Sequence, residues 1–252
     1  MINRYASLRQ GLVGCWVPSL GASGFRLIDL SGYGNHGVLT NMDPGTDWVP
    51  SGGKLSLDFD GTDDYVDCGA FQSPFVSAFS ISAWLSSRTL PSNNNQQIVF
   101  GWGSNNIANA GIFLKVANNS NVLQYFVQKN QNGILTATTT PVVDKWIHFV
   151  VTIAGSRNNL YINSANESSG TAGTNPGTGS NFFIGSRAGS LPTNGQIDDV
   201  RFYSRVLTPS EISLLYTGGS GVGLIPERIK HRRKTSAAAT NRRRRILIGA
   251  SS

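Results

Sequence analysis

Apolar and polar residues alternate along many short segments of this chain. In KLSLDFD (54–60), Leu55, Leu57 and Phe59 are separated by single polar residues, and FSISAWLSS (79–87) repeats the pattern. A period of two places the apolar side chains on one face of a β-strand. Segments that alternate in this way, or that are rich in β-branched and aromatic residues, predict strands at 11–19, 54–60, 64–69, 79–87, 96–103, 111–117, 122–129, 133–140, 145–155, 159–164, 181–187 and 195–207.

The connections between these strands are rich in Gly, Asn and Pro, which are residues that form turns. No helical period separates one predicted strand from the next. The pattern therefore predicts an all-β fold, an antiparallel sandwich or barrel. The Gly-, Ser- and Thr-rich stretch 166–181 is predicted to be a loop.

One short helix is predicted after the last strand. In LTPSEISLLYTGG, Thr208 occupies the N-cap, Pro209 the first helical position and Glu211 the third. This arrangement is a capping box with its preferred proline. Gly218 is expected to end the helix after about two turns by adopting a left-handed backbone conformation.

Charge is divided unevenly along the chain. The 252 residues have a net charge of +7, but residues 1–225 contain 12 Lys and Arg against 13 Asp and Glu. Residues 226–252 contain nine basic residues and a single acid, Glu227. The predicted β domain is therefore close to neutral, and the C-terminal segment is expected to seek an acidic partner.

These observations divide the chain into an N-terminal extension (1–10), a β domain (11–217) and a Gly linker with an Arg-rich C-terminal arm (218–252). The arm is interpreted as an anchor, a nucleic-acid-binding segment or a solubilising tail. No aromatic residues lie among its arginines to stack on bases, which favours the anchor over nucleic acid. The predicted anchoring residues are Arg228, Lys230, Arg232, Arg233, Lys234, Arg242, Arg243, Arg244 and Arg245.

Other composition features exclude several classes. Cys15 and Cys68 lie far apart without a CxxC spacing, so two buried free thiols are favoured over a disulfide, a zinc site or a redox pair. No apolar run reaches the length of about 18 residues that a membrane span requires. The N-terminus is too polar for a signal peptide.

The order of the segments resembles a known family. GLVGCW, DLSGYGNHG, LDFDGTDDYVDCG, FSISAWL, KWIHFVVT, NLYIN, FFIGSR and GQIDDVRFYSRVLTPSEISLLY follow one another along the chain. This order is similar to that of concanavalin A-like, laminin G-like jelly-roll domains, which occur in tailed-phage virion proteins and in secreted bacterial proteins. The resemblance implies a jelly roll of two packed antiparallel sheets. It also implies glycan or protein binding at one rim or on the concave face, and in some members a calcium ion.

The acidic stretch 58–67 contains five of the fourteen acidic residues and has three interpretations. Glucanases of the family that the chain resembles use paired carboxylates, and Asp58 and Asp60 have the spacing of same-face neighbours on a strand. Calcium binding by carboxylates is the second interpretation. The favoured interpretation is a hairpin turn in which Gly61 adopts a positive φ and aspartates accept backbone hydrogen bonds.

Two ligand sites are predicted. The resemblance places calcium where the first and last strands meet, which points to Asp29, Asn35, Asp198 and Asp199 as ligands. The alternative is that these side chains only stabilise turns. A glycan site needs an aromatic platform beside amides. Trp102 with Asn105 and Asn106 is the preferred candidate, Tyr33 and Trp48 are further platforms, and Trp16, Trp84 and Trp146 are predicted to lie in the core.

The function predicted from these features is that of a non-enzymatic virion structural protein. Its jelly roll is displayed outward as a capsid- or tail-associated decoration or adhesion module, and its arm binds other virion subunits. Cell-surface glycans are a possible second partner, and nucleic acid is a less favoured one. No membrane association is expected, and a homo-oligomer is left open. The alternative is a free-standing lectin, and the remote alternative is a glycoside hydrolase. The expected location is the virion, assembled in the host cytoplasm, with structural Ca²⁺ as the one candidate cofactor.

Overall fold

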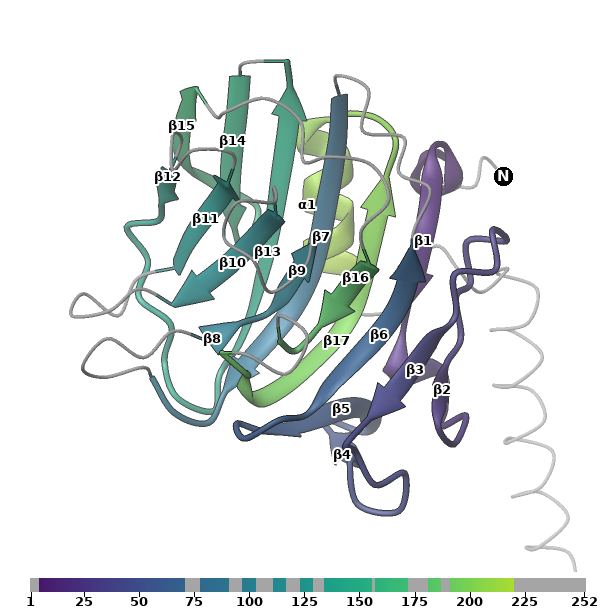
Figure 1. Cartoon of the computed structure of the whole chain (residues 1–252). Helices are drawn as coiled ribbons and strands as arrows, with labels where there is room; N and C mark the ends of the chain where they lie inside the picture. The colour runs from purple at the N-terminus through teal and green to yellow at the C-terminus, as the bar shows by residue number, and fades with distance from the viewer. Residues whose placement is uncertain are drawn as a thin grey trace, which may run out of the picture.

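Two layers of antiparallel strands form the body of the protein (Figure 1). The computed structural model describes residues 5–70, 78–90, 97–102, 111–116, 123–128, 134–155, 157–171, 181–186 and 191–219. The first half contains β1 (Leu12–Trp16), β2 (Arg26–Leu27), β3 (Gly37–Thr40), β4 (Trp48–Ser51), β5 (Lys54–Asp60), β6 (Tyr65–Ala70), β7 (Ala78–Ser87), β8 (Gln97–Ile98) and β9 (Phe100–Trp102). The second half contains β10 (Gly111–Val116), β11 (Leu123–Gln128), β12 (Ile134–Thr136), β13 (Trp146–Ala154), β14 (Arg157–Ile162), β15 (Ala165–Thr171), β16 (Asn181–Ile184), β17 (Asn194–Tyr203) and the helix α1 (Pro209–Gly218).

One layer is an eight-stranded sheet in the order β15-β14-β13-β7-β17-β5-β4. The long strand β17 pairs with β7 along one side. Along its other side it pairs with β5 through residues 194–197 and with β1 through residues 200–203. The first and last strands of the domain are therefore neighbours.

The other layer consists of two sheets that continue one another. One has the order β2-β3-β6-β16-β9, and the other has the order β12-β11-β10-β8. Only Val99 separates β8 from β9, so one chain segment passes from one sheet into the other. The two-layer arrangement confirms the predicted jelly-roll sandwich.

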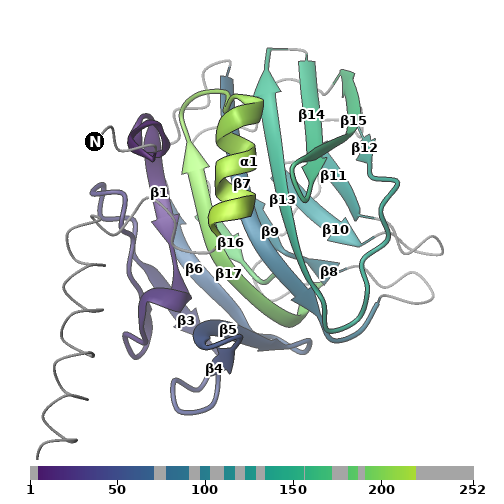
Figure 2. The same ribbon diagram turned by 180° about the vertical axis from the view of Figure 1, so that it is seen from behind.

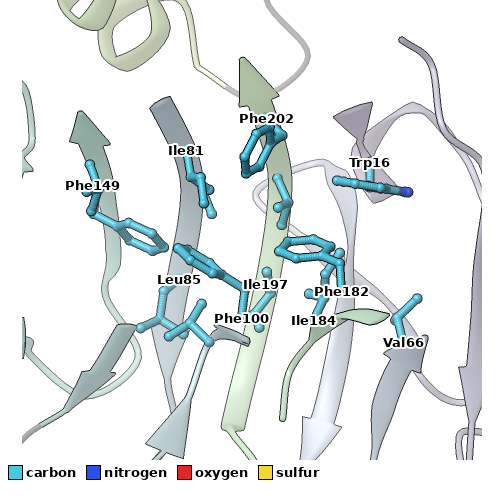
Figure 3. Close-up of a cluster of buried hydrophobic side chains, with 14 of the residues drawn as sticks. Trp16, Val66, Ile81, Leu85, Phe100, Phe149, Phe182, Ile184, Ile197 and Phe202 are labelled. Carbon is cyan, nitrogen blue, oxygen red and sulfur yellow. The ribbon is translucent and has the colours of Figure 1, made fainter. Parts of the chain in front are cut away.

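The core lies between the layers and is formed by the in-phase residues of the alternating strands (Figure 3). Phe100 of one layer stacks on Phe149 of the other with ring centroids 5.8 Å apart. Trp16 stacks on Phe182 at 5.2 Å in the same way. Burial of aromatic and aliphatic side chains from both layers stabilises the sandwich.

The helix α1 covers the outer face of the eight-stranded sheet (Figure 2). Ile212 and Leu215 pack there against Tyr203 and Val150, in a second apolar cluster that also contains Tyr5 and Leu8. The capping box of Thr208 and Glu211 is present as predicted. The predicted end is wrong by one residue, because Gly219 and not Gly218 is the C-cap with φ 68°.

The side chain of Glu211 also pairs with Arg205, which donates to both carboxylate oxygens at 2.7 and 2.8 Å. Burial raises the pKa of Glu211, but hydrogen bonds from Arg205 and from the Thr208 backbone outweigh it and lower the pKa to about 2. The carboxylate therefore ties α1 to the preceding loop in its ionised form.

The structure also tests the predicted loop at 166–181 and the predicted state of the two cysteines. Residues 165–171 form β15, paired with β14, so the predicted loop at 166–181 begins too early. Glu167 holds this strand by accepting hydrogen bonds from Thr138 and Thr139. Cys15 and Cys68 are buried free thiols, which confirms the favoured alternative.

Among the residues with described structure, no helix combines the length and the apolar character needed to cross a bilayer.

Candidate functional site

A groove of about 220 Å³ opens on the outer face of the eight-stranded sheet, next to the end of α1. We call it the aromatic groove; its lining residues are Ser51, Gly52, Lys54, Leu55, Trp84, Trp146, Asp198 and Gly219. They come from β4, β5, β7, β13, β17 and the helix C-cap, so only the folded chain assembles them.

Strand register explains the floor of the groove. Trp84 of β7 lies directly opposite Asp198 of β17 on one side and His148 of β13 on the other. Residues opposite one another in an antiparallel pair share a face of the sheet. Trp146 lies two residues before His148 and therefore projects from the same face. The two indoles thus stand on adjacent strands, away from the core.

The β4–β5 hairpin forms one wall. Its loop is Gly52–Gly53, with φ 57° and 82°, which suits the two-residue turn that matches the twist of the strands. Ser51 Oγ accepts a hydrogen bond of 3.0 Å from Trp146 Nε1, which fixes the indole against this wall. The ammonium group of Lys54 follows on the exposed side of the same hairpin.

Trp84 of the groove also belongs to an aromatic stack with His148 and Tyr216. Trp84 lies 4.8 Å from the His148 ring and 5.8 Å from the Tyr216 ring of α1. His148 is buried, and its Nε2 lies within hydrogen-bond distance, 2.9 Å, of Ser82 Oγ. Burial lowers the pKa of His148 to about 3, so the imidazole is neutral at physiological pH. The indole of Trp84 is therefore positioned by contacts with neutral rings, those of His148 and Tyr216.

A buried ion pair lies near this stack. Arg201 donates to both oxygens of Asp199, at 2.6 and 2.8 Å, and the side chains are 0% and 3% exposed. The pairing of β17 with β7 is interrupted by a bulge between Asp198 and Arg201, where Asp199 has φ 50°. Asp198 faces the groove, and Asp199 faces Arg201.

The groove has the chemistry of a small polar-ligand site. Half-buried indoles offer flat apolar faces, while Ser51, Lys54 and the largely buried carboxylate of Asp198 place polar groups beside them. Pyranose and furanose rings have apolar C–H faces and polar edges, which match this combination.

The predicted calcium ligands are only partly brought together. Asp29 and Asn35 are neighbours, since Asp29 Oδ2 accepts a hydrogen bond of 2.9 Å from the Asn35 backbone. Asp29 also accepts hydrogen bonds from Cys15 N at 2.8 Å and Ser31 N at 2.9 Å. These bonds fasten the Gly-rich loop to β1, as the turn-stabilising alternative proposes.

The two late acids have other partners. Asp198 Oδ1 accepts hydrogen bonds from Ser19 N at 3.2 Å and Asp199 N at 2.7 Å. Asp199 is bidentate to Arg201, whose charge competes with a cation at that carboxylate. Calcium at Asp29, Asn35, Asp198 and Asp199 stays a prediction.

A closer set of carboxylates lies in the β5–β6 turn. One carboxylate oxygen from each of Asp60, Asp63 and Asp64 lies within 4.8 Å of the others. Asp60 accepts a hydrogen bond from Thr62 N, and Asp64 accepts one from Asp60 N, while Gly61 has φ 83°. The predicted turn is present, with Gly61 at positive φ and aspartates accepting backbone hydrogen bonds, but its assignment as a hairpin is wrong, because β5 and β6 belong to different sheets and the turn connects the two layers. The three carboxylates supply at most part of the six to eight oxygens that calcium takes.

The aromatic residues considered in the sequence differ in their burial. Trp48 is wrong as a platform, because it is buried and donates from Nε1 to Gly24 O. Tyr33 is 68% exposed. Trp84 and Trp146 are wrongly assigned to the core, whereas Trp16 is correctly assigned.

Other predicted site residues lie at the end of a described segment or outside the described residues. Trp102 ends β9, and nothing is described of its side chain. Asn105, Asn106 and the arm residues 228–245 lie outside the described residues.

Comparison with known proteins identifies the fold. Residues 60–213 match the family model Laminin_G_3, described as the concanavalin A-like lectin/glucanases superfamily. No curated protein sequence matches the chain. Among solved structures, domain 4 of AbnA, a GH43 extracellular arabinanase from Geobacillus stearothermophilus in complex with arabinotriose, aligns with a TM-score of 0.61 and 20% identity. The alignment covers 80% of this chain and 96% of that domain.

Trypanosoma rangeli sialidase aligns with a TM-score of 0.59 and 19% identity over 82% of this chain. The same sialidase in complex with sialic acid gives a TM-score of 0.60 and 21% identity. The alignment covers 32% of the sialidase chain in each case, so this chain corresponds to about a third of that enzyme. At these identities the likeness concerns the fold.

Proposed function

Because the chain belongs to the concanavalin A-like lectin/glucanases superfamily, we propose that it is a non-catalytic module that binds a glycan in the aromatic groove. The observation that carries this proposal is the pair of half-buried indoles, Trp84 and Trp146, on the outer face of the sheet beside polar groups. The similar arabinanase domain, which is matched over 96% of its length, is itself described in complex with arabinotriose.

The carboxylates of the described residues support a non-catalytic role. Asp58, one member of the candidate pair, is in an ion pair with Arg88. Asp60 accepts a turn hydrogen bond from Thr62. A retaining hydrolase needs two carboxyls about 5–5.5 Å apart that are available to the substrate. Glu167 and Glu211 are likewise occupied, by threonines and by a helix cap.

The second part of the proposal concerns the arm. Its nine basic residues within residues 226–252 contrast with a nearly neutral domain, so recognition and attachment are divided between two parts of one chain. In this proposal the arm fixes the module to acidic surfaces of other subunits in a larger particle, such as a tailed-phage virion, and the groove faces outward.

A glycan array followed by titration calorimetry tests the groove, with arabinotriose as the first soluble probe. Trp146→Ala is expected to lower the affinity for the glycan identified by at least about tenfold, because aromatic platforms carry much of the energy of such sites. Phe25→Ala, which removes an exposed aromatic outside the groove, is the matched control and should bind as the wild type does.

Two results would contradict the proposal. One is an array without selective binding by the folded full-length protein. The other is unchanged affinity in Trp146→Ala with an intact thermal transition. Release of reducing sugar that Asp58→Asn abolishes would instead support the hydrolase.

A further inference from the structure

Exposed apolar side chains are concentrated in one segment of the domain. Six of the nine large apolar residues that are exposed among the described residues lie between positions 20 and 38. Phe25 and Tyr33 are 64% and 68% exposed. We call this set the apolar edge; it consists of Leu20, Phe25, Ile28, Leu30, Tyr33 and Val38. Contiguous exposed apolar side chains are typical of an interaction surface, whereas single exposed apolar residues are ordinary.

Strand geometry places the centre of the apolar edge on one face. Arg26 of β2 pairs with Val38 of β3, so the two side chains share the outer face of their sheet. Burial alternates from residue 26 to residue 30, with Leu27 and Asp29 buried, so Ile28 and Leu30 project to the same side as Arg26. The short strand β2 is also the end of its sheet (Figure 1).

Aspartates border this surface. Strand β3 ends at Thr40, which pairs with Tyr65 directly after the β5–β6 turn, and Asn41 Nδ2 donates to Asp63 O at 3.2 Å. The next loop holds Asp43 and Asp47 and is linked to the residue before Phe25 through the Trp48 hydrogen bond to Gly24. We call the bordering acids the aspartate rim; they are Asp43, Asp47, Asp60 and Asp63.

The rim produces a negative local potential. Burial raises the pKa of Asp64, and the charges of Asp60, Asp47 and Asp63 raise it further, to about 6. Arg26 projects from the same face as Val38 of the apolar edge, and its single charge does not balance the four acids of the rim. A ligand for this surface should therefore be apolar in part and strongly cationic.

The C-terminal arm has this composition. Leu224–Ile225 and Ile246–Leu247–Ile248 are apolar, and nine Lys and Arg residues lie between them. Arginine forms bidentate hydrogen bonds with carboxylates, which makes the RRRR run at 242–245 a good match for paired aspartates. Charge and apolar pattern thus agree between the arm and the surface formed by the edge and the rim.

We propose that the apolar edge and the aspartate rim bind the C-terminal arm of a second copy of this chain. The described chain leaves α1 at Gly219, on the outer face of the eight-stranded sheet, whereas β2 and β3 belong to the other layer (Figures 1 and 2). The 33 residues that follow Gly219 span up to about 110 Å when extended, so the arm is long enough to reach this surface on a neighbouring copy. This inference specifies one acidic partner for the arm of the proposed function, and it is independent of the glycan site.

Sedimentation velocity of the full-length, nuclease-treated protein tests the inference. The protein should self-associate with concentration, and the dimer Kd should rise with salt, because screening weakens arginine–aspartate contacts. Two variants remove one side of the contact each. The edge variant combines Phe25→Ser with Asp63→Asn, and the arm variant replaces Arg242–Arg245 by Gln. Each should raise the dimer Kd by about tenfold or more.

The matched control combines Val142→Ser with Asp144→Asn, because Val142 is 61% exposed and Asp144 is exposed, both outside the apolar edge. It should associate as the wild type does. A mixture of the edge variant and the arm variant should again form a heterodimer, since one chain keeps the arm and the other keeps the surface. Recovery of the heterodimer establishes binding between copies.

Four outcomes would overturn the inference. They are a monomer at all concentrations, self-association that is lost on nuclease treatment, equal effects of the edge and control variants, and a mixture that does not recover association. Unchanged glycan affinity in the edge and arm variants leaves the function proposed for the groove intact, so the two proposals can fail separately.

Discussion

The buried ion pair between Asp199 and Arg201 permits a quantitative prediction. The substitution Asp199→Asn keeps the size of the side chain and suits its left-handed backbone, φ 50°, because Asn tolerates that conformation. It removes the negative charge beside Arg201, which is 0% exposed and already has one buried nitrogen, Nη1, without a hydrogen-bond partner. The change therefore leaves a buried guanidinium charge uncompensated.

The expected cost follows from burial. Breaking a buried pair by removing one partner costs about 3–5 kcal/mol of unfolding free energy. For a domain of this size, each kcal/mol lowers Tm by about 2–4 °C, so the variant should melt roughly 6–20 °C below the wild type. The matched control is Asp58→Asn, which breaks the ion pair of Asp58 with the half-exposed Arg88 and should cost about 0–1 kcal/mol.

Urea unfolding followed by tryptophan fluorescence measures both variants, with calorimetry for Tm. A loss below about 1 kcal/mol in Asp199→Asn, or equal losses in the two variants, would refute the argument that burial sets the cost.

Three further predictions concern the helix cap, the acidic turn and the core. Glu211 has a folded-state pKa of about 2 against an ordinary value of 4.5, so its ionisation stabilises the folded state above pH 4.5, and this stabilisation is lost as the pH falls toward 2. Glu211→Gln should remove this part of the pH dependence of the free energy of unfolding in urea. The pKa of Asp64 is raised to about 6, so its ionisation destabilises the folded state as the pH rises from about 4 to 6. Asp64→Asn should therefore have a higher Tm than the wild type at pH 7, and the difference in Tm should disappear at pH 4. Gly185→Ala places a Cβ 2.1 Å from Phe59 Cε1 at a residue with φ 87°. Gly69 has a similar φ of 71° but open space around it, so Gly69→Ala should lower the free energy of unfolding by only roughly 1 kcal/mol, and Gly185→Ala should lower it by well over that amount. Thermal melts of the two variants compare these losses.

Local sequence determined most of the strands and the helix. Leu57 and Phe59 alternate with polar residues because one face of β5 is buried, and this period survives in any two-layer sandwich. Thr208 and Glu211 satisfy the first backbone N–H groups of α1 within one turn, so its beginning needs no tertiary contact. The short strand β15 was missed because Gly, Ser and Thr there pair with β14 without an apolar signal.

The groove required the tertiary structure. The alternation of β7 and β13 already placed Trp84 and Trp146 out of phase with the core residues, and this was the signal that the assignment to the core overlooked. Whether an outward indole becomes a solvated surface residue or part of a site depends on its neighbours across strands. Asp198, the β4–β5 hairpin and Gly219 are distant in sequence and meet these indoles only through strand register and the docking of α1. Periodicity fixes the face on which a side chain lies, but the pairing of remote strands decides what lies beside it.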